Sequence, residues 1–367
     1  METRAAIARR RRGSVPVKSR QPNRGNRRLP ARQSTLGLTL LVALAAAGGC
    51  DNIPPPPGTS APPSSSMPNR GLVVFMGAGE GDPLWPILKT SAQRYEDSLG
   101  LIPIRYVNPA GRSPQDQIDC LRALHDPEMR GLCIHIIDVD AIRPILRKMY
   151  SRGVRIVSMI QPAPREVRAG HVGFDNRAIG TALAKATAKA LDGAGAIALL
   201  HAGYEHPVYG PRRIAFEKEL LLQPDIEVFT KRDCRTNPRE ARKIIREYSP
   251  RFPRLSAWVA LDDWPLRDRG LDDLPIPRGC KFITFGGTPV QWPLIESGIS
   301  AGIVAANYGE LGTKAVLYCE AALSELPRFE NRYYAPLRTL WATNLDEYKR
   351  DWTYWSTGKF PQAELEP

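Results

Sequence analysis

Short apolar runs alternate with longer amphipathic segments from residue 71 to residue 323, and this alternation limits the possible folds more than any other feature of the chain. Apolar runs of about four to eight residues are typical of buried strands, and apolar residues three and four positions apart are typical of helices. The runs predict strands at 72–76, 102–107, 131–137, 154–160, 171–174, 196–200, 226–230, 257–261, 282–285 and 301–305. The amphipathic segments predict helices at 84–99, 114–125, 140–151, 177–191, 212–222, 238–248, 290–297 and 311–323. Repeated β-α units imply parallel sheets covered by helices on both faces, so the predicted fold class is α/β.

The folded part is long enough for two lobes. About 297 residues follow residue 70, a length at which a chain can form two separate cores. Two successive sets of β-α units therefore predict two doubly wound, Rossmann-like lobes. Ligands of open α/β sheets bind beyond the carboxyl ends of the strands, so we expect one binding site in the cleft between the lobes.

The first fifty residues have the order of an export signal. Arginines crowd the start, including the run 9–12, and a short apolar run follows at 35–47. That run ends in two glycines before Cys50, and a basic, then apolar, then small-residue order is typical of a secretory signal. At about 13 residues the run is too short to span a bilayer. The alternative is a buried N-terminal helix, which the Pro- and Ser-rich stretch 51–70 disfavours because such a stretch does not form a core.

The basic start also accounts for the net charge. The chain carries a formal charge of +13, which by itself would suggest a nucleic-acid ligand. Residues 1–50 hold eleven Lys and Arg residues and one acid, which leaves only +3 for residues 51–367. We therefore expect no nucleic-acid partner, because the excess charge belongs to the export signal and no DNA-binding module precedes the lobes.

The residues that usually carry metal or catalytic chemistry form no known pattern. Five cysteines follow Cys50, namely Cys120, Cys133, Cys234, Cys280 and Cys319. Their spacing fits no metal site, and their odd number in an exported chain implies at least one free thiol. The sequence also allows one disulfide but does not say which cysteines would form it. No Ser-His-Asp order, HExxH motif or carboxylate pair stands out, so we expect neither an enzyme nor a metal or cofactor. The glycine-rich stretch 77–81 is similar to a dinucleotide fingerprint, but Pro83 interrupts its turn.

Six short motifs occur in a fixed order along the folded part. They are Gly81-Asp82-Pro83-Leu84-Trp85, His171-Val-Gly-Phe-Asp175-Asn176, Arg212-Arg213-Ile-Ala-Phe216, Ala260-Leu-Asp262-Asp263, Thr284-Phe285-Gly286-Gly287-Thr288-Pro289 and Ala342-Thr343-Asn344-Leu-Asp-Glu-Tyr348. In this order and spacing they resemble the type I periplasmic binding proteins, in the sugar-binding (ribose- and galactose-like) branch of ABC-transporter solute-binding lipoproteins. The resemblance covers residue 71 to about residue 348.

The resemblance implies a domain organisation and a location. The fold would be two Rossmann-like lobes with a hinge of three crossings. The predicted parts are 1–49 (signal peptide of lipoprotein type), 50–70 (lipidated Cys50 and linker), 71–175 plus 307–331 (N-terminal lobe), 176–306 plus 332–350 (C-terminal lobe) and 351–367 (C-terminal tail). Small residues before Cys50 resemble a lipobox, although Ala47 replaces its usual leucine. The protein would thus lie in the periplasm or cell envelope, held to the membrane by a lipid on Cys50.

Carried over position by position, the resemblance implies a sugar site. Asp82 would hydrogen-bond the ligand, and Trp85 would stack on it. Arg212 would donate hydrogen bonds, and Asp262 would accept hydroxyl protons in place of the family's Asn.

Three positions depart from the family's sugar-binding set. Ile160 and Gln161 stand where the family often has Asp-Arg, and Gly286 stands where it has a ligand-binding Asp. We include Gln161 in the predicted site, together with Asn307 as a replacement polar group near the last crossing. These departures leave the identity of the ligand open.

Each of these residues also has a structural interpretation. Asp82 would cap the first helix, Trp85 would belong to the core, and Arg212 would pair with Glu217. His206 and Tyr209, in the loop before Arg212, would face the cleft. We expect four further histidines, which lie on or beside apolar segments, to be structural: His125, His135, His171 and His201.

The function that the resemblance implies is the extracytoplasmic capture of a sugar or sugar-like small molecule. The protein would act as a monomer and deliver its ligand to an ABC permease in the membrane. One alternative is a ligand sensor that feeds a membrane signalling kinase. Another is an enzyme, such as a dehydrogenase or hydrolase, on the same scaffold.

Overall fold

The computed structural model describes residues 71–100, 102–124, 126–267, 274–324 and 332–360. All of them belong to one compact unit of the chain. The signal peptide, Cys50 and the linker predicted for residues 1–70 lie outside the described residues, as do His125 and the end of the predicted tail, 361–367.

The first half of the described chain and the late strand β11 form a parallel sheet of six strands in the order β11-β5-β4-β3-β1-β2. Its strands are β1 (Leu72–Met76), β2 (Ile104–Val107), β3 (Met129–His135), β4 (Arg155–Ile160), β5 (Arg168–Gly173) and β11 (Arg332–Tyr334). Because the ladders are parallel, successive strands need crossover connections, and helices supply them except in the short link 161–167 between β4 and β5.

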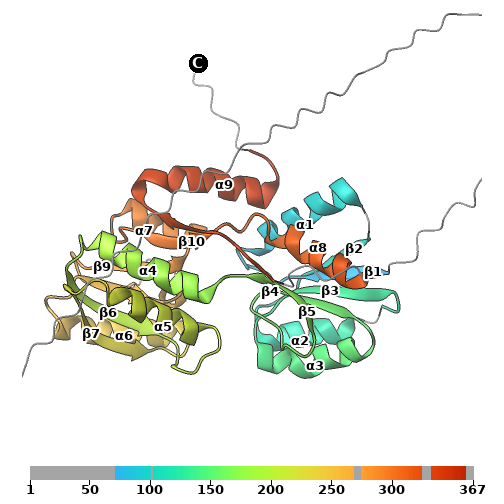
Figure 1. The fold of residues 1–367 in the computed structure, drawn as a ribbon, viewed down its shortest axis with the longest axis horizontal. Coiled ribbons are helices and arrows are strands. Elements are labelled where there is room, and N and C mark those ends of the chain that lie inside the picture. Colours follow the sequence, from blue (N-terminus) through green and yellow to red (C-terminus); the bar gives the residue numbers. More distant parts are fainter. Residues whose placement is uncertain (1–70, 101, 125, 268–273, 325–331, 361–367) are drawn as a thin grey trace, which may run out of the picture. The chain divides into compact units, whose positions relative to one another are not determined.

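Side chains alternate across this sheet and build a core on each face (Figure 1). Val73 and Phe75 pack with the buried face of α1 (Trp85–Leu99) and α8 (Leu311–Leu323). Val74 and Met76 pack on the other face, where α2 (Pro114–Ala123) and α3 (Val139–Ser151) lie. The period of two along β1 therefore accounts for the helices on both sides.

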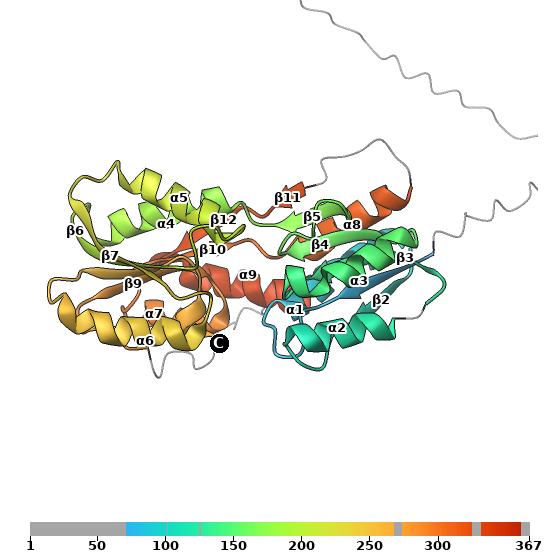
Figure 2. The ribbon, with the colours of Figure 1, turned by 90° about the horizontal axis from the view of Figure 1, so that it is seen from below.

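The second sheet repeats the arrangement of the first, in the order β12-β10-β9-β8-β6-β7. Its strands are β6 (Gly195–His201), β7 (Ile226–Asp233), β8 (Ala257–Ala260), β9 (Lys281–Gly286), β10 (Ile303–Ala306) and β12 (Leu337–Leu340). All pairs are parallel except β10 with β12. Figure 2 shows the helices on its two sides: α4 (Asn176–Ala190) with α5 (Tyr209–Leu220), and α6 (Pro238–Tyr248) with α7 (Trp292–Glu296).

One glycine in each lobe allows two helices to touch at the backbone. A Cβ atom on Gly180 of α4 would lie 2.0 Å from the carbonyl oxygen of Arg212 on α5. A Cβ atom on Gly312 of α8 would lie 2.0 Å from the carbonyl oxygen of Leu88 on α1. The two lobes therefore use the same close helix packing, in which no larger side chain fits.

The chain passes between the two sheets three times. It leaves the first sheet after β5, returns to it through α8 after β10, and leaves again between β11 and β12. This confirms the predicted fold class of two doubly wound lobes with three crossings. None of the described helices combines the length and apolar character needed to cross a membrane.

The last helix, α9 (Leu345–Thr357), was not among the predicted helices. Tyr348, Trp352 and Trp355 are buried along one stripe of it, and the side-chain hydroxyl of Thr90 on α1 donates to the carbonyl of Ser356 at 3.0 Å. The predicted tail from residue 351 therefore begins inside a packed helix. Likewise β11, predicted to belong to the C-terminal lobe, pairs with β5 of the first sheet.

A buried histidine on β5 makes stability depend on pH. His171 is 4% exposed, and its Nδ1 lies 3.0 Å from the Oγ of Ser158. Burial, and next the charge of Arg168, lower the pKa of His171 to about 4. Its pKa in the unfolded chain is about 6.5, so the unfolded state binds more protons between about pH 4 and 6.5, and stability rises with pH there.

We expect the free energy of unfolding to be about 2 kcal/mol lower at pH 5 than at pH 7 because of His171 alone. Urea denaturation at the two pH values measures this difference. The variant His171→Gln, whatever its absolute stability, should lose that part of the slope. An unchanged slope in the variant would assign the pH dependence to other groups.

Candidate functional site

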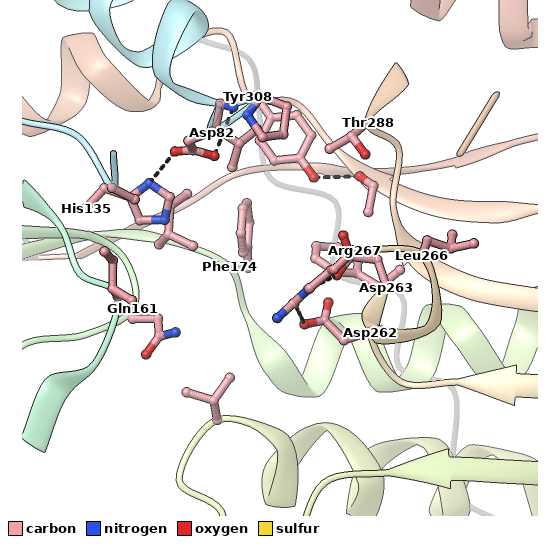
Figure 3. Close-up of a pocket in the computed structure, with 18 of the residues that line it drawn as sticks. Asp82, His135, Gln161, Phe174, Asp262, Asp263, Leu266, Arg267, Thr288 and Tyr308 are labelled. Atoms are coloured by element: carbon pink, nitrogen blue, oxygen red, sulfur yellow. Dashed lines mark hydrogen bonds and ion pairs between the residues drawn. The ribbon is translucent and has the colours of Figure 1, made fainter. Parts of the chain in front are cut away.

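A cavity of about 520 Å³ lies where the carboxyl ends of strands from both sheets meet (Figure 3). The loops after β1, β3, β4 and β5 line it from the first sheet, and the loops after β6, β8, β9 and β10 line it from the second. Its polar lining residues include Asp82, Arg112, His135, Gln161, Asn176, Tyr209, Arg212, Asp262, Asp263, Arg267, Thr288 and Tyr308. The position is the one expected for ligands of open α/β sheets.

Asp82 and His135 lie side by side on the first-lobe side of the cavity. Asp82 is 6% exposed, and its Oδ2 lies 3.0 Å from the Nδ1 of His135 at the end of β3. Its Oδ1 accepts the backbone N–H of Leu84 at 3.2 Å, just before α1. Burial acts to raise the pKa of Asp82, but the charge and hydrogen bond of His135 outweigh it and lower that pKa. Asp82 is not the N-cap of α1, because Leu84 holds that position without a side-chain cap hydrogen bond. Asp82 lines the cavity, and its contact with a ligand stays a prediction.

His135 corrects the expectation that it is only structural. It lines the cavity beside Asp82, and Figure 3 shows its ring directed from β3 toward the open space. Its place on an apolar strand made it look like a core residue, whereas its position at the carboxyl end of that strand brings it to the site.

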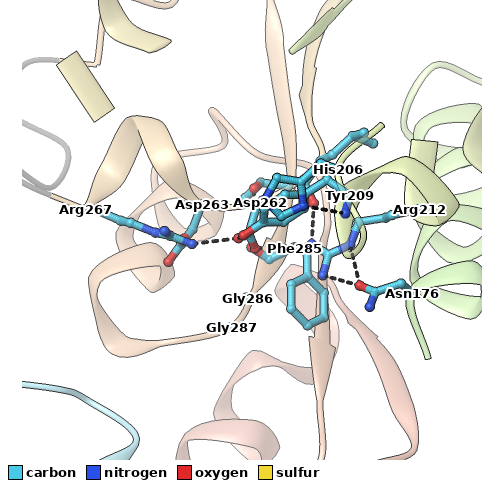
Figure 4. A network of polar contacts seen from close by, with 12 residues as sticks. Asn176, His206, Tyr209, Arg212, Asp262, Asp263, Arg267, Phe285, Gly286 and Gly287 are labelled. Carbon is cyan, nitrogen blue, oxygen red and sulfur yellow. Dashed lines mark hydrogen bonds and ion pairs between the residues drawn. The ribbon is translucent and has the colours of Figure 1, made fainter. Parts of the chain in front are cut away.

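Arg212 is fixed in the second-lobe wall by four hydrogen bonds (Figure 4). Its Nε and Nη2 donate to the Oδ1 of Asn176 at 3.1 and 2.8 Å. Its Nη1 donates to the carbonyl of Leu261 at 2.6 Å and to the Oδ1 of Asp262 at 3.2 Å. The guanidinium carbon lies 4.7 Å from the ring centroid of Phe285, in reach of a cation–π contact. At 3% exposure, Arg212 organises this wall.

Arg212 does not form the alternative pair with Glu217. The carboxylate of Glu217 instead contacts Arg213 at 2.6 Å and Lys231 at 2.8 Å. The structural interpretation of Arg212 as a surface ion pair is therefore wrong.

Asp262 lies at the centre of the same polar network. Its Oδ2 accepts the hydroxyl of Tyr209 at 2.8 Å and the Nη2 of Arg267 at 2.6 Å, while its Oδ1 faces Arg212. Burial, and next the charge of Asp262, raise the pKa of Tyr209, so the phenol keeps its proton and remains a donor. Asp263 accepts the Nε of Arg267 at 2.5 Å. Two arginines and a tyrosine therefore share one carboxylate.

The structure brings four of the six predicted ligand residues to the cavity: Asp82, Gln161, Arg212 and Asp262. Trp85 lies outside the lining, with its ring 6.2 Å from that of Phe75 in the core. Asn307 is also outside, because its Oδ1 accepts the N–H of Gly309 at 3.1 Å within the crossing. Tyr209 lines the cavity as expected, whereas His206 does not.

Several lining residues were not among the predicted site residues. Phe174 stands in the middle of the cavity wall, with its ring centroid 5.4 Å from that of Phe285 and 5.7 Å from that of Tyr308. Asn176 lies in the motif 171–176 but was given no ligand role, and Arg267 follows the short 3-10 turn Trp264–Leu266 outside all six motifs. The sequence placed these residues shortly after predicted strands. That position predicts that they lie near the binding site, but it does not predict what each side chain does there.

Ile160 holds an unfavourable backbone conformation at the edge of the cavity. Its φ is +66°, a value that β-branched residues rarely adopt. The N–H of Gln161 donates to the carbonyl of Met159 at 2.7 Å, which closes a γ-turn around Ile160. This turn ends β4 and places Gln161 in the lining.

The family model for the periplasmic binding protein domain matches residues 73–325. The chain belongs to the periplasmic binding proteins. Among the described residues of this periplasmic binding protein, no group of three or more His, Cys, Asp or Glu side chains is placed to hold a metal ion.

Solved structures share the fold at low sequence identity. A sugar ABC transporter sugar-binding protein from Bacillus halodurans has a TM-score of 0.64 at 19% identity, over 76% of this chain and 99% of that one. AraP, an arabinose-binding protein from Geobacillus stearothermophilus, has a TM-score of 0.65 at 14% identity, over 76% and 99%. A solute-binding protein from Actinobacillus succinogenes with bound D-allose has a TM-score of 0.64 at 13% identity, over 76% and 100%. No curated protein matches the chain.

Replacing Ile160 in this periplasmic binding protein tests the strain at the cavity edge. Asn tolerates positive φ, whereas Thr is β-branched like Ile and does not. Both replacements remove apolar contact, so that loss is shared by the two variants. Because only Asn relieves the backbone strain, we expect Ile160→Asn to be more stable than Ile160→Thr by about 1 kcal/mol. Urea denaturation of the two variants measures the difference. A Thr variant at least as stable as the Asn variant would contradict strain at this turn.

Proposed function

We propose that the protein captures a sugar or sugar-like polar ligand in the cavity and delivers it to an ABC permease. The observation that carries this proposal is the cavity itself, in which buried polar side chains from both lobes converge beside apolar ones. Such a pocket buries a small molecule and orients it through a few fixed polar groups. The sugar-binding proteins that share the fold support the choice of ligand class.

The proposed ligand contacts come from both walls of the cavity. Asp82, His135 and Gln161 would contact the ligand from the first lobe. Asn176 and Arg267 would contact it from the second, where Arg212 and Asp262 hold the wall in place. Binding that engages both walls would favour closure of the lobes on the ligand.

Export and anchoring complete the proposal. Residues 1–49 would be removed as a signal peptide, Cys50 would carry the lipid, and 51–70 would tether the lobes to the membrane. The lobes would be 71–175 with 307–334 and 176–306 with 335–357, acting as a monomer with a membrane permease as partner. A non-enzymatic role agrees with the family, whose members are binding proteins.

The ligand-binding proposal predicts a specific effect of Gln161. Isothermal titration of the full chain carrying Cys50→Ser, so that no lipid is attached, should detect a sugar or sugar derivative. Gln161→Ala should weaken that binding about tenfold, because one hydrogen bond to a desolvated group is lost. Gln115→Ala, on the exposed face of α2, should leave affinity unchanged. Failure of every neutral and charged sugar tested to bind would count against the proposal.

The anchoring proposal predicts a lipid at one defined atom. Expression in a bacterium with lipoprotein processing should yield a chain that begins at Cys50 and carries a diacyl group on its sulfur. Mass spectrometry of the membrane fraction measures the mass and the N-terminus. Cys50→Ser should abolish the lipid, while Cys120→Ser should retain it. A lipid-free mature chain with Cys50 intact would rule the anchor out.

A further inference from the structure

The carboxylates that line the cavity are largely committed to partners within the protein. One oxygen of Asp82 accepts the N–H of Leu84, and the other is buried 3.0 Å from the Nδ1 of His135. Both oxygens of Asp262 accept hydrogen bonds, from Arg212, Tyr209 and Arg267. Asp263 uses its Oδ1 for Arg267. A neutral sugar needs acceptors for its hydroxyl protons as well as donors for its hydroxyl oxygens, and these carboxylates have little accepting capacity left.

Two positions that hold carboxylates in the resembled sugar site hold none here. Ile160 supplies only an apolar side chain, and Gly286 supplies no side chain at all. A Cβ atom on Gly286 would lie 2.4 Å from the Oε1 of Gln291, and the φ of +147° also favours glycine. The backbone conformation and the buried side chain of Gln291 therefore both disfavour an acid at position 286.

Donor groups, in contrast, remain available on both sides of the cavity. The Nη1 of Arg267 has no partner among the described residues, and its side chain is 40% exposed while Asp262 and Asp263 fix the guanidinium (Figures 3 and 4). Arg112 forms no ion pair within the described part of the chain and reaches only the carbonyl of Gly81, at 3.5 Å. The Oγ1 of Thr288, in a residue 7% exposed, has no hydrogen-bond partner in the described structure.

We propose that the ligand is a sugar acid whose carboxylate binds the guanidinium of Arg267. This inference rests on the proposed function and narrows its ligand class. A carboxylate is an acceptor-only, planar group that matches the fork of an arginine. It replaces hydroxyls that would otherwise lack acceptors, and the side chains of Asn176, Gln161 and Thr288 serve the remaining hydroxyls. Arg112 adds positive charge from the opposite lobe.

The test compares acids with neutral sugars of the same ring. Titration calorimetry of the full chain carrying Cys50→Ser would use D-glucuronate against D-glucose and D-galacturonate against D-galactose. We expect the acid of at least one pair to bind at least tenfold more tightly than its neutral partner. Its affinity should fall as salt is raised, since part of the attraction is between charges.

Variants locate the carboxylate. Arg267→Gln should bring the acid to within about threefold of the neutral sugar, and Arg267→Lys should give an intermediate loss because it keeps charge without the fork. Arg239→Gln, an exposed arginine on α6, should leave both affinities unchanged. Thermal unfolding of each variant checks that the fold persists.

The outcomes separate the inference from the proposed function. Neutral sugars that bind as tightly as the acids, with no effect of Arg267→Gln, overturn the inference and leave sugar capture standing. A sugar phosphate that binds more tightly than both acids overturns the assignment of a carboxylate. No binding of acids, phosphates or neutral sugars overturns both.

Discussion

Parallel strand pairing is the constraint on which the rest of the structure depends. It turns the carboxyl ends of the parallel strands toward one edge of each sheet, and most successive strands are joined through a helix. The order of strands around β1 in the first sheet is repeated around β6 in the second. The two sheets share one cavity at these edges. The cavity therefore brings together loops that are far apart in sequence, such as the loop after β1 and the loop after β10. The topology of the two sheets therefore determines where the site lies, whichever side chains line it.

The two walls of the cavity differ in the number of polar contacts among their side chains. The second-lobe wall is a dense network in which Asp262 is shared by Arg212, Arg267 and Tyr209. The first-lobe wall has the single pair Asp82 and His135, with Gln161 placed by the strained turn at Ile160. Three side chains of this wall therefore donate hydrogen bonds to one buried carboxylate. Asp262, where the resembled family has Asn, is thus held by side chains of its own wall while it lines the cavity.

Much of this could be predicted from the sequence, and the failures have physical reasons. Continuous apolar runs identified strands such as β1, and amphipathic spacing identified α6 and α8 with their observed bounds. The edge strands β11 and β12 were not predicted, because they are short and half exposed and therefore lack an apolar run. The resemblance implied Asp82, Arg212 and Asp262 position by position and Gln161 at a departure from the family, and all four line the cavity. Arg267 was not, because its role depends on carboxylates that only the folded chain brings beside it.

The late position of α8, β11 and α9 in the chain has a consequence for biosynthesis. The first sheet lacks a covering helix and an edge strand until residues 311–334 have been made, and α1 lacks its contact with α9 until about residue 357. Neither lobe can close its core while the C-terminal segment is still missing, since these contacts are among the most distant in sequence. A nascent chain of this design stays incompletely folded until translation is nearly finished, which is the state that a translocation channel for unfolded polypeptides requires.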